Sequence, residues 1–137
     1  MSMSTPVSIM IVEDEWDLAR LLGMYVANSG FDSILFTEPL LALDHYIQNS
    51  KTYALIVVDW SMPDLNGVEL AKEIRKFNSQ VKILLITGWL VEDVLDSIGF
   101  KEAKISAVLR KPIDLENFGP RIVQLCSRDE GSTNIHR

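Results

Sequence analysis

Five short apolar runs, separated by segments with a helical period, constrain the fold of this chain more than any other feature. The run at 54–58 is apolar on consecutive residues, as in a strand covered on both faces. Because each right-handed crossover returns the chain to the same edge, this alternation predicts a parallel sheet. We therefore expect an α/β fold, with a doubly wound five-stranded sheet and helices on both faces. The predicted strands lie at residues 7–12, 33–36, 54–58, 81–86 and 105–109.

An apolar stripe at helical spacing follows each run, which predicts five helices. Pro39 stands near the start of the second, where a first helical turn tolerates proline. The band in the fourth helix is wide, so we expect most of it in the core and part of it at a partner surface. The stripes consist of Leu18, Leu21, Leu22, Tyr25 and Val26; Leu40, Leu43 and Ile47; Leu70, Ile74 and Phe77; Leu90, Val91, Val94, Leu95 and Ile98; and Leu115, Phe118, Ile122 and Leu125.

Length and composition predict one globular domain. The chain has 137 residues, 47% hydrophobic and 23% charged, enough to bury a core without disulfides. We expect the folded domain over residues 7–127, with flexible ends at residues 1–6 and 128–137. A lone cysteine, Cys126, and the lack of a signal-like or membrane-length apolar segment indicate a cytoplasmic protein. A net charge of −6 has the wrong sign for direct nucleic-acid binding.

Polar side chains follow four of the five runs. Glu13 and Asp14 come after the first run, Asp59 after the third, Thr87 after the fourth and Lys111 after the fifth. In an open parallel sheet the strands end at one edge, and ligands bind there at the switch point of strand order. With the order 2-1-3-4-5 of a flavodoxin-like sheet, the first and third strands are neighbours. Three carboxylates are then expected to meet beside a hydroxyl and an ammonium group.

Three neighbouring carboxylates repel one another, which raises at least one pKa unless a cation compensates. Mg²⁺, with Mn²⁺ as the alternative, suits the site because it takes oxygen ligands and keeps several waters. We expect Asp14 and Asp59 to bind it directly and Glu13 to act through water. If Lys111 holds the oxygens of a phosphodonor, Asp59 is placed to attack phosphorus and become an acyl phosphate. Thr87 is placed to donate its hydroxyl to that group and to change rotamer between the two states.

The chain resembles the receiver domain of bacterial two-component response regulators (CheY-like superfamily) over residues 7–127. The segments that carry the resemblance are "IMIVEDE", "LIVVDWSMPDLNGVEL", "ILLITG" and "VLRKPI". The resemblance also implies a cis bond between Lys111 and Pro112. It implies these site residues: Asp59 as phospho-acceptor, Glu13, Asp14, Asp59 and the backbone carbonyl of Ser61 as metal ligands, Thr87 as switch hydroxyl and Lys111 as the phosphate-binding lysine.

Two places depart from the family pattern. The family usually carries Tyr or Phe three residues before the lysine, as a ring that swings inward when the hydroxyl moves, but this chain has Val108. Coupling from Thr87 to the outer surface must therefore use other groups or be weak. The segment "GFKEAKIS" also lacks the Gly-Ala pair common before the fifth strand. Beside the site, we expect Trp89 to shield the phosphoryl group partly and Ser61 to tune its lifetime.

Three functions compete. The first is a receiver that takes a phosphoryl group from a histidine kinase or phosphotransfer protein and acts through an effector domain, a partner protein or a second copy of itself. The second is an interaction module that works without phosphorylation, which Val108 favours. The third, a small hydrolase or nucleotide-binding domain, lacks a Gly-rich phosphate loop and a nucleophile beside a usable His. The complete acid cluster favours the first, and we expect no enzyme activity beyond self-phosphorylation and autodephosphorylation.

Overall fold

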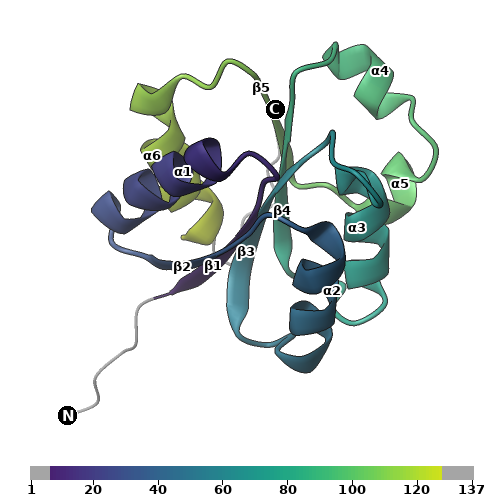
Figure 1. The fold of residues 1–137 in the computed structure, drawn as a ribbon, viewed down its shortest axis with the longest axis horizontal. Coiled ribbons are helices and arrows are strands. Elements are labelled where there is room, and N and C mark those ends of the chain that lie inside the picture. Colours follow the sequence, from purple (N-terminus) through teal and green to yellow (C-terminus); the bar gives the residue numbers. More distant parts are fainter. Residues whose placement is uncertain (1–6, 128–137) are drawn as a thin grey trace.

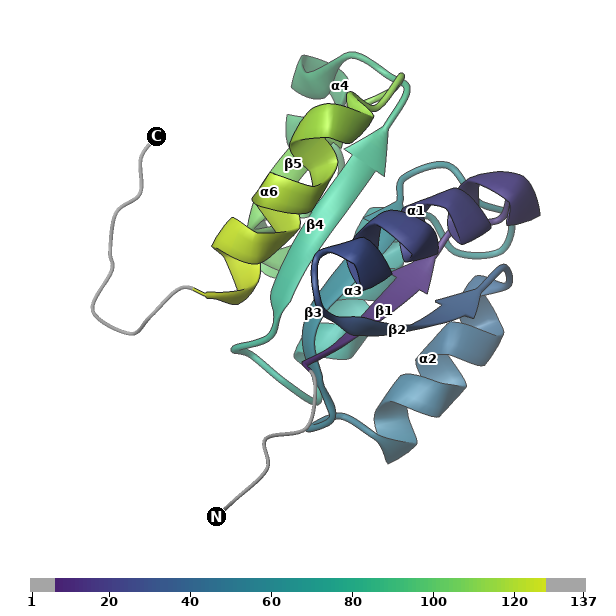
Figure 2. The same cartoon turned by 90° about the vertical axis from the view of Figure 1, so that its left-hand side faces the viewer.

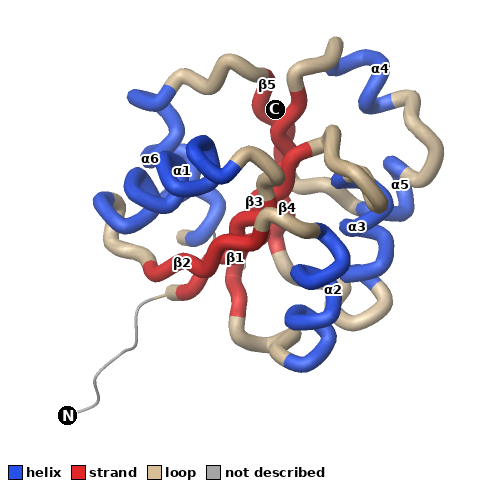
Figure 3. The backbone as a smooth tube through the Cα atoms, viewed as in Figure 1, coloured by secondary structure: helices blue, strands red, loops and turns tan. Residues whose placement is uncertain are grey.

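The sheet contains five parallel strands, as the sequence predicts. A computed structural model describes residues 7–127, and the ends expected to be flexible lie outside the described residues. The strand order is β2-β1-β3-β4-β5, and every neighbouring pair is parallel. Figure 3 shows these strands running through the centre of the molecule. Their bounds are β1 (Ser8–Val12), β2 (Asp32–Phe36), β3 (Tyr53–Asp59), β4 (Lys82–Thr87) and β5 (Ala107–Arg110).

Helices cover both faces of the sheet, so the predicted doubly wound α/β architecture is confirmed. On one face, α1 and α6 bury Leu22 and Phe118 against the strands. On the other, α2 and α3 bury Tyr46 and Leu70, and α4 and α5 continue this layer (Figures 1 and 2). The helices are α1 (Trp16–Asn28), α2 (Pro39–Gln48), α3 (Gly67–Arg75), α4 (Val91–Leu95), α5 (Phe100–Ala103) and α6 (Leu115–Cys126).

Burial along the strands explains their sequences. Leu55, Ile56, Val57 and Val58 of the central strand β3 are all buried, because helices cover both of its faces. The edge strand β2 instead leaves Asp32 and Ile34 exposed. Within residues 7–127, no helix is both long enough and apolar enough to cross a bilayer.

The fourth helix is not the continuous core helix that the sequence predicted. The chain forms two short helices, α4 and α5, separated by residues 96–99. Val94 is buried, whereas the exposed fractions are 51% for Leu90, 48% for Leu95 and 94% for Ile98. Gly99, with φ +90°, lies in the left-handed region, and this backbone conformation directs the chain away from a continuous helix. The expectation that most of this band is core was therefore wrong.

The face of α2 that packs on the sheet also differs from the prediction. Leu40 and Ile47, expected to face the core, are exposed, and Ala42 and Tyr46 are buried instead. The tyrosine offers a large apolar ring, and its hydroxyl donates to the carbonyl of Ser50 at 3.0 Å, so its polar atom is satisfied. Apolar residues on both sides of this helix made the inward face ambiguous in the sequence. Similarly, Phe77 of the third stripe lies beyond the end of α3 and is exposed.

Candidate functional site

Strand geometry places the predicted site residues along the carboxyl edge of the sheet. Glu13 and Asp14 directly follow β1, and Asp59 is the last residue of β3. Thr87 is the last residue of β4, and Lys111 directly follows β5. Because β1 pairs with β3, and β3 with β4, these side chains come from neighbouring strand ends. The structure therefore brings these side chains to the same edge of the sheet, as the strand order predicts.

Three carboxylates form a compact cluster at this edge. Ligand oxygens of Glu13, Asp14 and Asp59 lie within 4.8 Å of one another. The exposed fraction is 1% for Glu13 and 3% for Asp59, whereas Asp14 is exposed. The cluster thus combines two buried carboxylates with one exposed carboxylate, and it is open to water on the side of Asp14.

Glu13 has one satisfied and one unsatisfied oxygen. Its Oε2 accepts a hydrogen bond from the backbone N–H of Glu15 at 3.0 Å. Its Oε1 is buried and has no hydrogen-bond donor among residues 7–127, although Lys111 Nζ lies 3.5 Å away as an ion-pair partner. Burial raises the pKa of Glu13 to about 7, and the charge of Asp59 adds to the rise. The Glu15 amide and the charge of Lys111 oppose it without cancelling it.

Asp59 and Lys111 form the closest ion pair of the site. Lys111 Nζ lies 3.1 Å from Asp59 Oδ1. Burial raises the pKa of Asp59, the lysine opposes the rise, and the charge of Asp14 reinforces it. Burial would lower the pKa of Lys111, but the charges of Asp59 and Glu13 raise it overall, so its ammonium form is favoured. One lysine therefore only partly compensates three acids.

The cluster fits a hard divalent cation. Mg²⁺ binds carboxylate oxygens and retains water ligands, so one exposed acid beside two buried ones suits it. The unsatisfied Oε1 of Glu13 is the clearest sign of this fit, because a buried charged oxygen without a donor costs free energy. A cation would lower the pKa of both buried acids and remove that cost.

The loop after β3 is held tightly. The backbone N–H of Trp60 donates to the carbonyl of Ile86 at 2.7 Å, and that of Gly67 donates to the carbonyl of Trp60 at 2.9 Å. A Cβ at Gly67 would lie only 2.6 Å from the carbonyl oxygen of Asp59, so glycine permits the start of α3 to approach the acid's own backbone. Asn66 and Glu69 close a capping box at the start of α3, each side chain accepting from the other's backbone N–H at 2.8 Å.

The loop after β4 is held differently. Thr87 is fully buried, and its Oγ1 accepts from the backbone N–H of Trp89 at 2.9 Å. Its backbone carbonyl accepts from the N–H of Lys111 at 2.7 Å, which fixes the main chain of Thr87 against the start of the next loop. Trp89 is 57% exposed, and Ser61 on the opposite loop is also exposed. The Lys111–Pro112 peptide bond is cis, as the resemblance implies.

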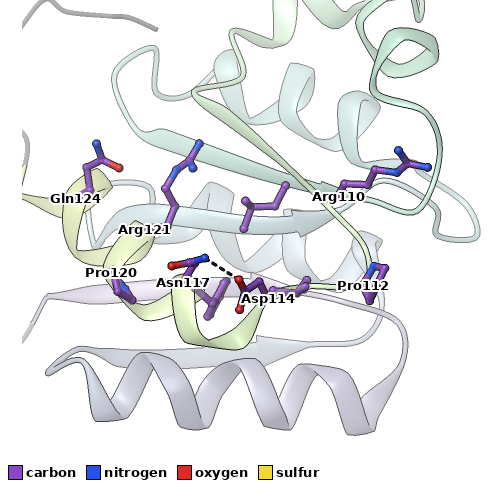
Figure 4. Close-up of a pocket in the computed structure, with 10 residues that line it drawn as sticks. Arg110, Pro112, Asp114, Asn117, Pro120, Arg121 and Gln124 are labelled. Carbon is purple, nitrogen blue, oxygen red and sulfur yellow. Dashed lines mark hydrogen bonds between the residues drawn. The ribbon is translucent and has the colours of Figure 1, made fainter.

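A separate recess lies between β5 and α6 (Figure 4) and shares no residue with the carboxylate cluster. Asp114 lines it, but both of its oxygens are engaged: Oδ1 accepts from the backbone N–H of Glu116 at 3.1 Å, and Oδ2 from Asn117 Nδ2 at 2.6 Å. This acid therefore serves as the N-cap of α6 rather than as a free ligand.

Sequence reasoning missed two features, one in the site and one at the opposite edge of the sheet. The hydrogen bond from the Glu15 amide to Glu13 could have been anticipated from the start of a helix so close to the acid. Arg75 was not singled out, yet its guanidinium donates to four backbone carbonyls: Asn78 at 3.2 Å, Val81 at 2.7 Å, Ala103 at 2.9 Å and Lys104 at 2.7 Å. No sequence signal indicates that role, because its partners come from separate segments of the chain.

The fold and the site together define a flavodoxin-like domain with a cluster of three carboxylates at the switch point of its sheet. A family model for the response regulator receiver domain matches residues 9–122. The chain therefore belongs to the response regulator receiver domain family. The expectation drawn from the sequence segments is confirmed at this level.

Similar proteins support the same assignment. The chain is 30% identical over 133 residues to the transcriptional regulatory protein RprY of Bacteroides fragilis, covering 96% of this chain and 54% of that protein. It is 30% identical over 120 residues to the response regulator ArlR of Staphylococcus saprophyticus, covering 88% and 52%. The chain thus spans about half the length of these curated relatives.

Solved structures share the fold. A receiver domain protein from Clostridium thermocellum superimposes with a TM-score of 0.78 at 20% identity, covering 88% of this chain and 94% of that one. The CheX–CheY complex of Borrelia burgdorferi with BeF3 and magnesium gives a TM-score of 0.80 at 18% identity, covering 90% and 91%. At these identities, the likeness shows the fold alone.

Proposed function

We propose that this chain is a phospho-accepting receiver domain in which Asp59 takes a phosphoryl group from a histidine kinase or phosphotransfer protein. The observation that carries the proposal is the buried, unsatisfied Oε1 of Glu13 within a three-carboxylate cluster that one lysine only partly neutralises. Such a cluster is costly for folding and useful for holding a cation and a phosphoryl group. Membership of the receiver family supports the same chemistry.

Asp59 acts as the nucleophile. Its carboxylate oxygen attacks phosphorus, a new O–P bond forms, and the bond from phosphorus to the donor nitrogen breaks. The donor imidazole leaves with the electron pair and takes a proton from water. Lys111, 3.1 Å from Asp59 in the resting state, exchanges that partner for a phosphoryl oxygen. Thr87 donates its hydroxyl to another phosphoryl oxygen.

Glu13, Asp14 and Asp59, with the backbone carbonyl of Ser61, would hold Mg²⁺ or, alternatively, Mn²⁺. The cation supplies charge that offsets the developing negative charge on the transferred group. Within the chain, the backbone N–H of Glu15 donates to Glu13 and holds its carboxylate in a fixed orientation. The only catalysis we assign to the domain is its own phosphorylation and the later hydrolysis of the acyl phosphate.

The output lies with other partners. The curated relatives extend well beyond the half that this chain matches, so we propose that an effector segment, a separate protein or a second copy of the chain receives the signal. The net charge of −6 argues against direct contact with nucleic acid by this domain. A cytoplasmic location, with no membrane contact, belongs to the proposal and rests on the lone Cys126 and the strand-sized apolar runs.

The second candidate is an interaction module of the same fold that works without phosphorylation. Val108, at the position where the family usually carries an aromatic ring, is the observation that favours it. In the structure, Val108 is half-buried and packs against the apolar cluster under α3. The carboxylate cluster argues against it, because a module without a cation or a phosphoryl group gains nothing from three acids in one place.

Intact mass after incubation with acetyl phosphate separates the two candidates. The samples are the parent and Asp59→Asn, each with and without Mg²⁺. The receiver proposal requires a Mg²⁺-dependent gain of one phosphoryl group in the parent and none in Asp59→Asn. No gain in a parent that binds Mg²⁺ by titration would reject the receiver and favour the module.

A further inference from the structure

Arg75, the last residue of α3, joins the beginnings of two neighbouring strands. Its Nη1 donates to the carbonyl of Val81 at 2.7 Å, and Val81 directly precedes β4. Its Nε and Nη2 donate to the carbonyls of Ala103 at 2.9 Å and Lys104 at 2.7 Å, shortly before β5 begins. Hydrogen bonds from a charged donor are stronger than those between neutral groups. One half-buried guanidinium therefore holds the main chain at the start of both β4 and β5.

Further hydrogen bonds join these two strands at each end. At the amino edge of the sheet, the backbone N–H of Ser106 donates to the carbonyl of Ile83 at 2.8 Å, and Ser106 Oγ accepts from the N–H of Ile83 at 3.0 Å. At the carboxyl edge, the N–H of Lys111 donates to the carbonyl of Thr87 at 2.7 Å. The two strands thus carry Thr87 and Lys111 at one edge of the sheet and are attached to Arg75 at the other.

The strand β5 depends on such contacts more than the strands that carry the carboxylates. It has four residues, lies at an edge of the sheet and pairs with β4 alone among the described strands. It is only half-buried over residues 107–109. By contrast, β1 and β3 are buried and have a neighbouring strand on each side. Pairing and burial therefore fix the carboxylates without Arg75, whereas the position of β5 along β4 relies on the contacts at its ends.

We propose that Arg75 is a positioning residue for phosphoryl transfer, because it fixes the starts of β4 and β5 and thereby sets where Thr87 and Lys111 stand relative to Asp59. This inference rests on the proposed function. Lys111 Nζ lies 3.1 Å from Asp59 Oδ1, and a misplacement of about 1 Å at a reacting group can lower a rate about 100-fold. A small slip of β5 along β4 would therefore weaken the hold on the phosphoryl group and leave the carboxylate cluster in place.

Two affinities, measured by titration calorimetry, separate this role from a general loss of stability. The affinity for Mg²⁺ alone requires the carboxylate cluster. The affinity for beryllofluoride, a phosphoryl mimic, at saturating Mg²⁺ also requires Thr87 and Lys111. Arg75→Lys keeps the charge but loses the planar fork that reaches several carbonyls at once. We expect its beryllofluoride affinity to fall about tenfold and its Mg²⁺ affinity to change by less than about twofold.

Two further variants complete the experiment. Ser106→Ala removes the acceptor of the Ile83 N–H but leaves Arg75 in place, so its beryllofluoride affinity should fall about threefold, again with Mg²⁺ affinity unchanged. This variant decides the test if Arg75→Lys does not fold. Val26→Ala truncates a buried residue of α1, a helix that packs on β1, β2 and α6, and is the control for lost stability. It should change neither affinity by more than about twofold.

Each outcome supports or overturns the inference. An equal fall of both affinities in Arg75→Lys, or an unchanged beryllofluoride affinity in every folded variant at positions 75 and 106, overturns it. Intact mass after incubation with acetyl phosphate and Mg²⁺ is measured on the same parent preparation. A phosphoryl gain in the parent, combined with either of those results, leaves the proposed function standing without the role of Arg75. No phosphoryl gain rejects the proposed function, and the inference is rejected with it.

Discussion

The loops after β3 and β4 begin beside the same carboxylate cluster, but they are held in different ways. The β3 loop leads through a full capping box into a nine-residue helix with five buried residues. The β4 loop leads through an uncapped Leu90 into a five-residue helix with one buried residue. Under the proposed function, the difference matches two tasks: the acceptor carboxylate needs a fixed position for the chemistry, and a conformational signal needs an element that can move at low cost.

The same substitution in the two loops should show the largest contrast. Gly67→Ala places a methyl group 2.6 Å from both the Asp59 carbonyl oxygen and Leu85 Cδ1, so the backbone must shift. We expect a loss of about 3 kcal/mol in the free energy of unfolding. Gly88→Ala has no atom nearer than Lys111 Cδ at 4.0 Å and should change stability by less than about 0.5 kcal/mol. Urea unfolding of both variants is the measurement, and equal losses would contradict the contrast.

The carboxylate cluster that both loops border should also show an unusual pH dependence of stability. The folded pKa of Glu13 is about 7, above its ordinary 4.5, so the folded state holds this proton more tightly than the unfolded state. The resulting stability is full below about pH 4.5 and is lost as pH rises through about 7. We expect this loss to be about 2–3 kcal/mol without Mg²⁺.

Urea unfolding of the metal-free protein between pH 4.5 and 8 measures this loss. Glu13→Gln cannot titrate at this position and should make the profile less steep than that of the parent, while Mg²⁺ should stabilise the parent above pH 7 because it binds the ionised acid. If the free energy of unfolding depends on pH in the same way in the parent and in Glu13→Gln, then Glu13 is not the group that causes the loss.

The capping difference predicts a smaller effect. Asn66→Ala removes half of the capping box of α3 and should cost about 1 kcal/mol. Leu90→Ser adds a cap to α4 and should slow amide exchange there several-fold, with little change in global stability. Urea unfolding and amide exchange measure the two effects. A global loss in Leu90→Ser would show that α4 is packed more firmly than its burial indicates.

The smallest expected effect concerns the lifetime of the phosphoryl group. Trp89 lies in the loop after β4 and is 57% exposed, and Ser61 lies in the loop after β3. Trp89→Ala should shorten the autodephosphorylation half-life about threefold, less than 1 kcal/mol in the barrier, by opening a path for water. Ser61→Asn should change the half-life by a similar factor. Equal half-lives in the parent and both variants would contradict a role for either residue.

The sequence predicted the loop after β3 and helix α3 well, but it predicted the loop after β4 and helix α4 poorly. The reason is physical. β3 has a continuous buried run that ends in Asp59, and its helix begins with the turn residues Asn66 and Gly67, so local and tertiary preferences agree. After β4, the spacing of Leu90, Val94 and Ile98 fits a helix, but the tertiary structure offers a buried place only to Val94. Periodicity reports where apolar residues could pack, not whether a surface is present to receive them.

The sequence predicted which residues meet at the candidate site, but it did not predict the hydrogen bonds between them. Strand ends and strand order were enough to bring Glu13, Asp14 and Asp59 together, because a parallel sheet fixes where its strands finish. The unsatisfied oxygen of Glu13 could not be foreseen, since it depends on how its other oxygen uses the Glu15 amide. The Thr87–Trp89 bond likewise depends on a side-chain rotamer, which spacing does not determine.

The strand order also determines when the acids first meet during synthesis. Glu13 and Asp14 leave the ribosome with the β1–α1–β2 unit, before Asp59 is made. The crowding begins only when β3, made later, pairs along the other edge of β1 and brings Asp59 with it. The chain can therefore complete its first supersecondary unit before Asp59 is present, and the repulsion from Asp59 arises only at the step that inserts the central strand.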